Sequence, residues 1–260
     1  MSGVYYAVAM ASALGFFVAM LGALEAGRRL RRWRARGGGA DGGPGAVAVE
    51  SAIFALLGLL IAFTFTGAAS RLDVRRDLAR DEANAIGTAW LRLDLLRAPD
   101  RLVLREKFRD YLQARIDTHR SFPDVAAAKA LLARAAGLQQ EIWSLAIAAA
   151  ERDGRVYVWT LVVPALNAMF DAATSRVNAV RMHVPWVILG LLAGLALLAS
   201  LLAGYGMVAT SGRDWMHMIT FSAVIAITLY VIVDLEFPRV GLIRIDVADE
   251  VLLDLRRSMD

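Results

Sequence analysis

Acidic side chains recur every fourth residue along one stretch of the chain, at Asp73, Asp77 and Asp81. At about 100° per residue of an α-helix, they share one face, and the same face carries Leu59 and Phe63 further toward the N-terminus. Around an axis shared by several copies, rings of carboxylates concentrate cations, and rings of large apolar side chains form constrictions that gate by dewetting. The chemistry predicted here is ion passage, with an apolar constriction at Leu59 and Phe63 and a cation-preferring acidic vestibule.

The rest of this face is small or hydroxyl-bearing in its apolar part, and we expect Ala55, Thr66 and Ser70 to line the same pathway. Two alternatives stay open. An apolar stripe also suits ordinary packing against lipid or other helices. The aspartates also suit ion pairs with arginines of a neighbouring copy, as helical charge runs commonly form.

A second polar group follows the aspartates. Glu82, Asn84 and Thr88 recur at helical spacing beside Trp90. Because buried polar groups are costly unless they are hydrogen-bonded, we expect these three residues to form a polar network between helices. Lining a vestibule is the alternative role.

Two more acids, Asp234 and Glu236, end an apolar segment near the expected membrane boundary. Ionisable side chains at that depth are usually kept for a partner or a pathway. The nearest candidate partners in the sequence are Arg239 and Arg244.

The residues needed for enzymatic chemistry are missing. The chain has no cysteine, so disulfides, thiolate catalysis and cysteine-bound metals are excluded together. Its three histidines, His119, His183 and His217, stand in separate segments without metal-ligand spacing. No serine belongs to a nucleophile-elbow motif. We therefore predict no enzyme, no metal site and no cofactor.

Apolar and charged residues are segregated along the 260-residue chain, which is 58% hydrophobic and yet 21% charged. A helix needs about 20 mostly apolar residues to cross a bilayer, and only helices or closed barrels satisfy their backbone groups there. Four unbroken segments qualify. They are 4–24, 52–70, 184–204 and 216–233.

The second of these segments passes into a charged helical run without Gly or Pro punctuation, so we expect one helix to continue from the membrane into water. Residues 71–183 keep helical apolar spacing throughout and are predicted to be a soluble helical region. Helix breaks are expected at Pro99–Asp100 and at Ser121–Asp124. A C-terminal segment, 234–260, follows the last membrane helix.

Six arginines between Arg28 and Arg36 follow the first apolar segment, and a Gly-rich linker over 37–45 follows them. Arginines in short loops set membrane orientation, and they can also attract anionic lipids. The positive-inside rule would place this loop in the cytoplasm, whereas arginines on the opposite side of the membrane offset it. We divide the chain into 1–49, the first membrane helix with its linker, and 50–260, the functional domain.

Three stretches resemble the bestrophin family of ion channels, and more closely the bacterial bestrophin-like proteins of unassigned function. LLIAFTFTGAASRLD, residues 59–73, is similar to the bestrophin pore helix in the spacing of Phe63 and Arg71. DEANAIGTAWLRLDLL, residues 81–96, is the strongest mark of the bestrophin-like group. DLEFPRVGLIRID, residues 234–246, looks like the segment that closes the bestrophin membrane domain.

The resemblance implies an all-α membrane protein with four transmembrane helices per subunit, assembled as a homopentamer around one pore lined by the second helix. It also implies cytoplasmic N- and C-termini, in a bacterial inner membrane. The sequence departs from the family by carrying Leu72 and Asp73, where tryptophans usually follow the arginine. The dense acidic calcium clasp of the animal channels is reduced to scattered acids.

The sequence thus predicts a bestrophin-like channel that conducts small ions passively, with the lipid bilayer, inorganic ions and copies of itself as partners and no nucleic acid. Two other functions stay open. One is a non-conducting membrane scaffold or signalling partner with a closed axis. The other is a transporter of small anions such as bicarbonate.

Overall fold

Every regular element in the described part of the chain is helical, with no strand in those ranges. A computed structural model describes residues 2–37, 44–122, 124–207, 215–238, 242–243 and 246–259, with the backbone alone at 2–6, 44 and 246–249. The predicted all-α fold class is confirmed.

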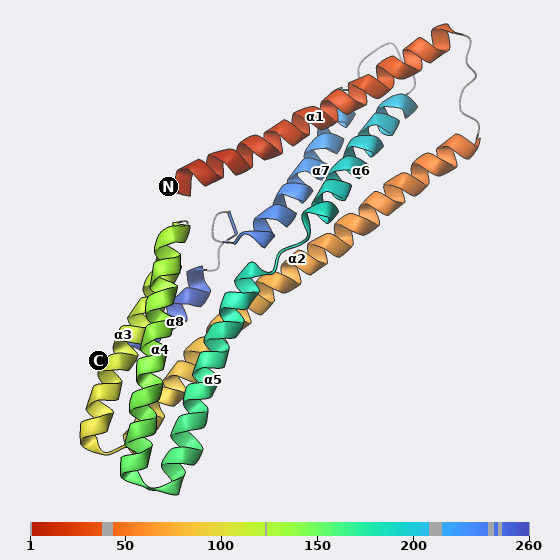
Figure 1. Cartoon of the computed structure of the whole chain (residues 1–260). Coiled ribbons are helices and arrows are strands. Elements are labelled where there is room, and N and C mark those ends of the chain that lie inside the picture. The colour runs from red at the N-terminus through yellow and green to blue at the C-terminus, as the bar shows by residue number, and fades with distance from the viewer. Residues whose placement is uncertain are drawn as a thin grey trace. The chain divides into compact units, whose positions relative to one another are not determined.

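Eight α-helices and one short 3₁₀ helix follow one another in the described ranges, coloured from red to blue in Figure 1. They are α1 (Ser2–Arg36), α2 (Pro44–Arg92), η1 (Leu93–Leu95), α3 (Ala98–Arg120), α4 (Val125–Asp153), α5 (Val156–Arg181), α6 (Trp186–Gly206), α7 (Trp215–Glu236) and α8 (Asp246–Ser258).

Local residue chemistry sets where the helices begin and end. α3 carries Pro99 in its first turn, where the missing N–H would have no intrahelical acceptor in any case. α4 begins after Asp124, whose carboxylate accepts hydrogen bonds from the backbone N–H groups of Ala126 and Ala127, at 3.0 Å each. Both breaks were predicted. The end of α4 at Gly154 was not, and there the backbone turns left-handed with φ of 71°.

α2 confirms the expectation that the second apolar segment does not stop at the membrane. It runs for 49 residues without a break, from Pro44 to Arg92. Residues 38–43 of the predicted Gly-rich linker lie outside the described residues, Gly37 forms a turn, and Pro44 and Gly45 already belong to α2.

The chain forms two compact units. The first unit comprises Met1–Ser70 and His183–Leu242. Within the described residues, four helical stretches are long and apolar enough to cross a membrane, which confirms the predicted number of spans. They are Ala7–Arg36, Gly45–Leu95, Val156–Gly206, which runs through α5 and α6, and Trp215–Glu236. Four such stretches are typical of an integral membrane protein.

Glycines allow α1 to pack tightly against α6 in the first unit (Figure 1). A Cβ atom added to Gly204 would lie 2.0 Å from the carbonyl oxygen of Leu24, and one added to Gly27 would lie 2.0 Å from that of Leu201. Such contacts require glycine, because any Cβ atom would clash with the facing backbone. Small residues at helix interfaces let the backbones approach closely, and the resulting van der Waals packing drives helix association in membranes.

The second unit comprises Arg71–Met182 and Ile243–Asp260. In it α3 packs against both α4 and α8, and α4 packs against α5 (Figure 1). One apolar core joins these helices to the end of α2, and its largest fully buried side chains are Ile86, Leu93, Leu104, Phe108, Tyr111, Leu112, Ile142, Leu166 and Met169. The buried face of α2 therefore supports a packed helical unit along residues 71–92.

Candidate functional site

The predicted pathway stripe lies on the open face of α2. Leu59 and Phe63 are 51% and 67% exposed within the single chain, and Ala55, Thr66 and Ser70 are exposed as well. The opposite face is covered, with its buried positions at Leu57, Thr64, Ala68 and Leu72. No residue in the described ranges therefore covers the stripe, and its large apolar side chains are left for lipid or for another protein chain.

The three aspartates continue the same open face. Asp73, Asp77 and Asp81 are all exposed. Arg76 lies 3.6 Å from Asp73, and Arg80 lies 3.1 Å from Asp77, each pair three residues apart on α2. Asp81 has no ion pair with any described residue. Two of the three carboxylates thus have an arginine partner on their own helix, whereas Asp81 has none among the described residues.

Arg75 lies on the buried face of α2, and the sequence did not single it out. Arg75 is buried, and its guanidinium donates hydrogen bonds to the carbonyl oxygens of Ala179 at 3.2 Å and Met182 at 2.6 Å. These carbonyls lie at the C-terminal end of α5, where backbone acceptors lack intrahelical partners and cations are favoured. Arg75 therefore anchors α2 to the end of α5 in the second unit.

Glu82 forms the most deeply buried polar cluster of the second unit. Its side chain is fully buried, and its two carboxylate oxygens accept hydrogen bonds from Arg115 Nε at 2.5 Å and from Arg176 Nη1 at 2.6 Å. The side chains of both arginines are less than 5% exposed. One carboxylate thus joins α2, α3 and α5. Asn84 and Thr88, predicted to share a network with Glu82, are exposed.

Arg115 and Arg176 were not singled out from the sequence, although a signal for Arg115 was present. It stands among the apolar positions of α3 that include Phe108, Tyr111 and Leu112, where a charge is unexpected. Next to this cluster, Gln139 donates a hydrogen bond to the hydroxyl of Tyr111 at 3.1 Å. Burial raises the pKa of the Tyr111 phenol to about 12.

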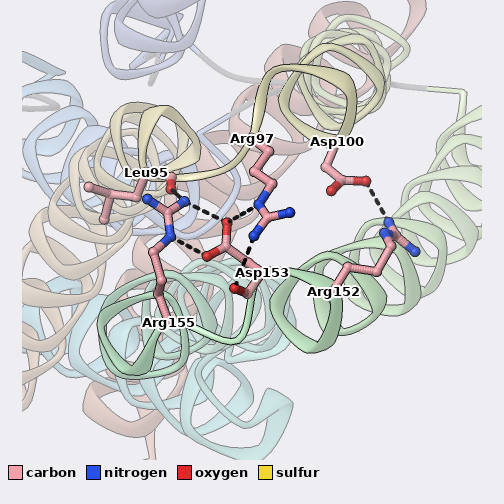
Figure 2. A network of polar contacts seen from close by, with 6 residues as sticks. All are labelled: Leu95, Arg97, Asp100, Arg152, Asp153 and Arg155. Atoms are coloured by element: carbon pink, nitrogen blue, oxygen red, sulfur yellow. Dashed lines mark hydrogen bonds and ion pairs between the residues drawn. The ribbon is translucent and has the colours of Figure 1, made fainter.

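Figure 2 shows a second polar network, where α4 ends close to the start of α3. The buried carboxylate of Asp153 accepts hydrogen bonds from Arg155 and lies 3.6 Å from Arg97 Nε. The hydrogen bond from Arg155 holds the pKa of Asp153 below its usual range. Arg152 and Asp100 pair beside them at 2.5 Å. These contacts hold the ends of the helices together, and the carboxylates of Asp100 and Asp153 are both engaged by arginines.

The boundary acids Asp234 and Glu236 are both buried in the first unit. Asp234 accepts a hydrogen bond from the backbone N–H of Leu242 at 2.9 Å, and Glu236 accepts one from that of Val184 at 3.2 Å. His183 Nδ1 lies 3.7 Å from Glu236. The partners suggested by the sequence, Arg239 and Arg244, lie outside the described residues.

No group of three or more histidine and carboxylate side chains that could hold a metal ion occurs within the described ranges. The scattered acids that stand in place of the clasp are Asp246, Asp249 and Glu250. The side chains of the first two lie outside the described residues, and Glu250 is exposed. The arrangement around α2 therefore offers an open stripe and buried structural ion pairs.

Comparison with known proteins identifies both the family and the fold. The family model of a Bestrophin-like domain matches residues 43–249. The fold is similar to crystal structures of a bacterial bestrophin homologue from Klebsiella pneumoniae. In a form with one tyrosine changed to alanine, the TM-score is 0.69 at 14% identity, covering 95% of this chain and 99% of that chain.

A second form of this homologue, with one tryptophan changed to alanine, gives a TM-score of 0.68 at 14% identity over 95% of this chain and 98% of that chain. A third structure of the homologue gives a TM-score of 0.67 at 14% identity, covering 94% of this chain and 98% of that chain. At this level of identity the similarity concerns the fold. No curated protein matches the chain.

Proposed function

Because the chain belongs to the bestrophin-like family, a family of ion channels, we propose that it forms a homopentamer that conducts small ions passively through a central pore. In this proposal α2 of each subunit lines the pore. The N- and C-termini lie in the cytoplasm, and the channel resides in a bacterial inner membrane.

The observation that carries the proposal is the open stripe of α2. Apolar side chains as large as Leu59 and Phe63 stay more than half exposed, although other helices of the unit bury Leu57 and Ala68 on the same α2. Five copies of Leu59 and Phe63 around an axis would form the apolar constriction, and such constrictions gate by losing water. Thr66, whose hydroxyl donates to the carbonyl oxygen of Ala62, would line the wider part.

The proposed selectivity is for cations. Asp73, Asp77 and Asp81 would stack as rings beyond the constriction and raise the local cation concentration. Arg76 and Arg80 reduce the charge of the first two rings. Because exposed ion pairs are weak, both rings retain part of their field, and the ring of Asp81 contributes the most.

Recordings from purified protein in planar lipid bilayers test the proposal. We expect discrete single-channel openings whose conductance rises in Phe63→Ala, since the smaller side chain widens the constriction. Under a KCl gradient, the reversal potential should be displaced from zero toward the equilibrium potential of K⁺. Silence in both the wild type and Phe63→Ala would contradict the proposal and favour a non-conducting scaffold. Saturable flux without discrete openings would indicate a transporter instead.

A further inference from the structure

A cationic cavity lies at the C-terminal end of α1 in the first unit. It encloses about 220 Å³ and is lined by Arg28, Arg31, Arg32, Ala35 and Arg36 of α1 and by Met207 at the end of α6. Four of its six lining residues are arginines. At about 100° per residue these α1 positions fall on one face of the helix, whereas Arg34 lies on another.

Arg28 is the most informative of these side chains. It is only 7% exposed, and within the described residues its Nη1 donates a hydrogen bond to the sulfur of Met218 at 3.3 Å. A guanidinium carries five N–H donors, and a thioether is a weak acceptor. Burying a cation is costly unless it is paired and hydrogen-bonded. A buried guanidinium that lines a cavity in this way calls for an anion.

Arg31 is held in place beside it. Its Nη1 donates to the carbonyl oxygen of Tyr205 at 3.1 Å, and its guanidinium lies 5.9 Å from the centre of the Tyr205 ring. These contacts position the guanidinium before any ligand arrives, which lowers the entropic cost of binding. Arg32 and Arg36 add two more planar donor groups, and such groups match the geometry of phosphate oxygens.

The cavity lies at the end of a candidate membrane span, Ala7–Arg36. Trp33, one turn from Arg36, is 73% exposed. Tryptophan is enriched at the level of the lipid headgroups, so this turn of α1 suits the membrane interface. A phosphate group of an anionic phospholipid would meet the arginines there, and so would a free phosphate ion from the water phase.

We propose that this cavity binds a phosphate group, held by Arg28, Arg32 and Arg36 beside the positioned Arg31. The site is independent of conduction, because none of these residues belongs to the α2 stripe. If the arginines only set the membrane orientation, positive charge alone would matter, and substitutions of Arg32 and Arg34 would have equal effects. A binding site requires the arginines that line the cavity.

Native mass spectrometry of the detergent-purified protein tests the site with dioleoyl phosphatidylglycerol, and zwitterionic dioleoyl phosphatidylcholine serves as the comparison lipid. We expect preferential binding of phosphatidylglycerol. Arg28→Gln and Arg32→Gln should each weaken that binding about tenfold, because each removes charge-assisted hydrogen bonds. The matched control Arg34→Gln, with the same charge change outside the cavity, should change it by less than about twofold. Should Arg28→Gln fail to fold, Arg32→Gln and Arg36→Gln carry the test.

A second arm distinguishes the source of the phosphate group. Inorganic phosphate is added to lipid-depleted protein at constant ionic strength, and the melting temperature is compared with that in chloride. Stabilisation that is lost in Arg32→Gln supports the site with free phosphate as its ligand. Lipid selectivity without this stabilisation supports it with a phospholipid headgroup. Equal binding of both lipids with no effect of phosphate, or equal effects of Arg32→Gln and Arg34→Gln, would overturn the proposal.

Discussion

Glu82 accepts a hydrogen bond from Arg176 at 2.6 Å and so joins α2 to a residue of α5 that lies 94 positions later in the chain. With Arg115 on the other oxygen, the carboxylate is surrounded by two guanidiniums in a fully buried setting. On the same helix, the preceding residue, Asp81, is exposed. Two consecutive acids of α2 therefore differ in their surroundings: Glu82 forms buried ion pairs, and Asp81 faces outward.

Loss of the Glu82 carboxylate is the first prediction. Glu82→Gln leaves two buried guanidiniums without their shared counter-charge, and breaking such a buried pair costs about 3–5 kcal/mol. Thermal unfolding in detergent should show a marked decrease in melting temperature. The matched control is Asp94→Asn, which breaks an ion pair to Arg105 that is half exposed and contributes less than about 1 kcal/mol. Equal decreases in the two variants would contradict the assignment.

A second prediction concerns the contact between α1 and α6. Gly204→Ala places a methyl group 2.0 Å from the carbonyl oxygen of Leu24, so the helices must separate, at a cost of about 1–3 kcal/mol or more. Gly194→Ala, on the same helix, adds a methyl group with nothing within 4 Å. Melting temperatures should decrease in Gly204→Ala and stay level or increase in Gly194→Ala. The opposite order would show that α1 and α6 do not pack this closely.

Alkaline titration provides a third prediction, through Tyr111. Its folded pKa of about 12 exceeds the ordinary value of about 10, so the unfolded chain ionises this phenol first. The stability that depends on the neutral phenol is complete below about pH 10 and is lost as the pH rises through 12. The difference in absorbance at 295 nm between wild type and Tyr111→Phe should have its midpoint near pH 12 for folded protein. In denaturant the midpoint should move to about pH 10, and a midpoint of 10 in the folded protein would refute the burial of this phenol.

Much of the fold follows from patterns within single helices. Continuous apolar runs predicted four membrane spans, and the lack of Gly or Pro between Ser70 and Ile86 predicted that α2 continues past the membrane without a break. Pro99 and Asp124 marked helix starts because their effects on the backbone are local. The open stripe from Ala55 to Asp81 also emerged from periodicity alone.

Contacts between distant segments could not be predicted in this way. Helical spacing grouped Glu82 with Asn84 and Thr88, whereas the partners of Glu82 come from α3 and α5. Spacing within one helix carries no information on which residues of another helix face it. For the same reason, the sequence did not foresee that Arg75 binds the end of α5, or that Gly27 and Gly204 are sites of close helix approach.

Selectivity measurements form a fourth prediction. Because Arg76 and Arg80 partly neutralise their own aspartates, Asp81→Asn should shift the reversal potential under a KCl gradient toward zero more than Asp73→Asn does. Both variants remove one exposed carboxylate per subunit and serve as controls for each other. An unchanged reversal potential in Asp81→Asn, or anion selectivity in the wild type, would contradict the acidic vestibule.

An ion pathway lined by α2 can be tested directly, because the chain has no native cysteine. Phe63 and Phe65 are both exposed, yet they point about 200° apart around the helix. Phe63→Cys and Phe65→Cys are compared in planar bilayers before and after a charged, water-soluble methanethiosulfonate reagent. We expect the reagent to block most of the current in Phe63→Cys and to leave that of Phe65→Cys unchanged. An unaffected Phe63→Cys current, or equal block in both variants, would contradict it.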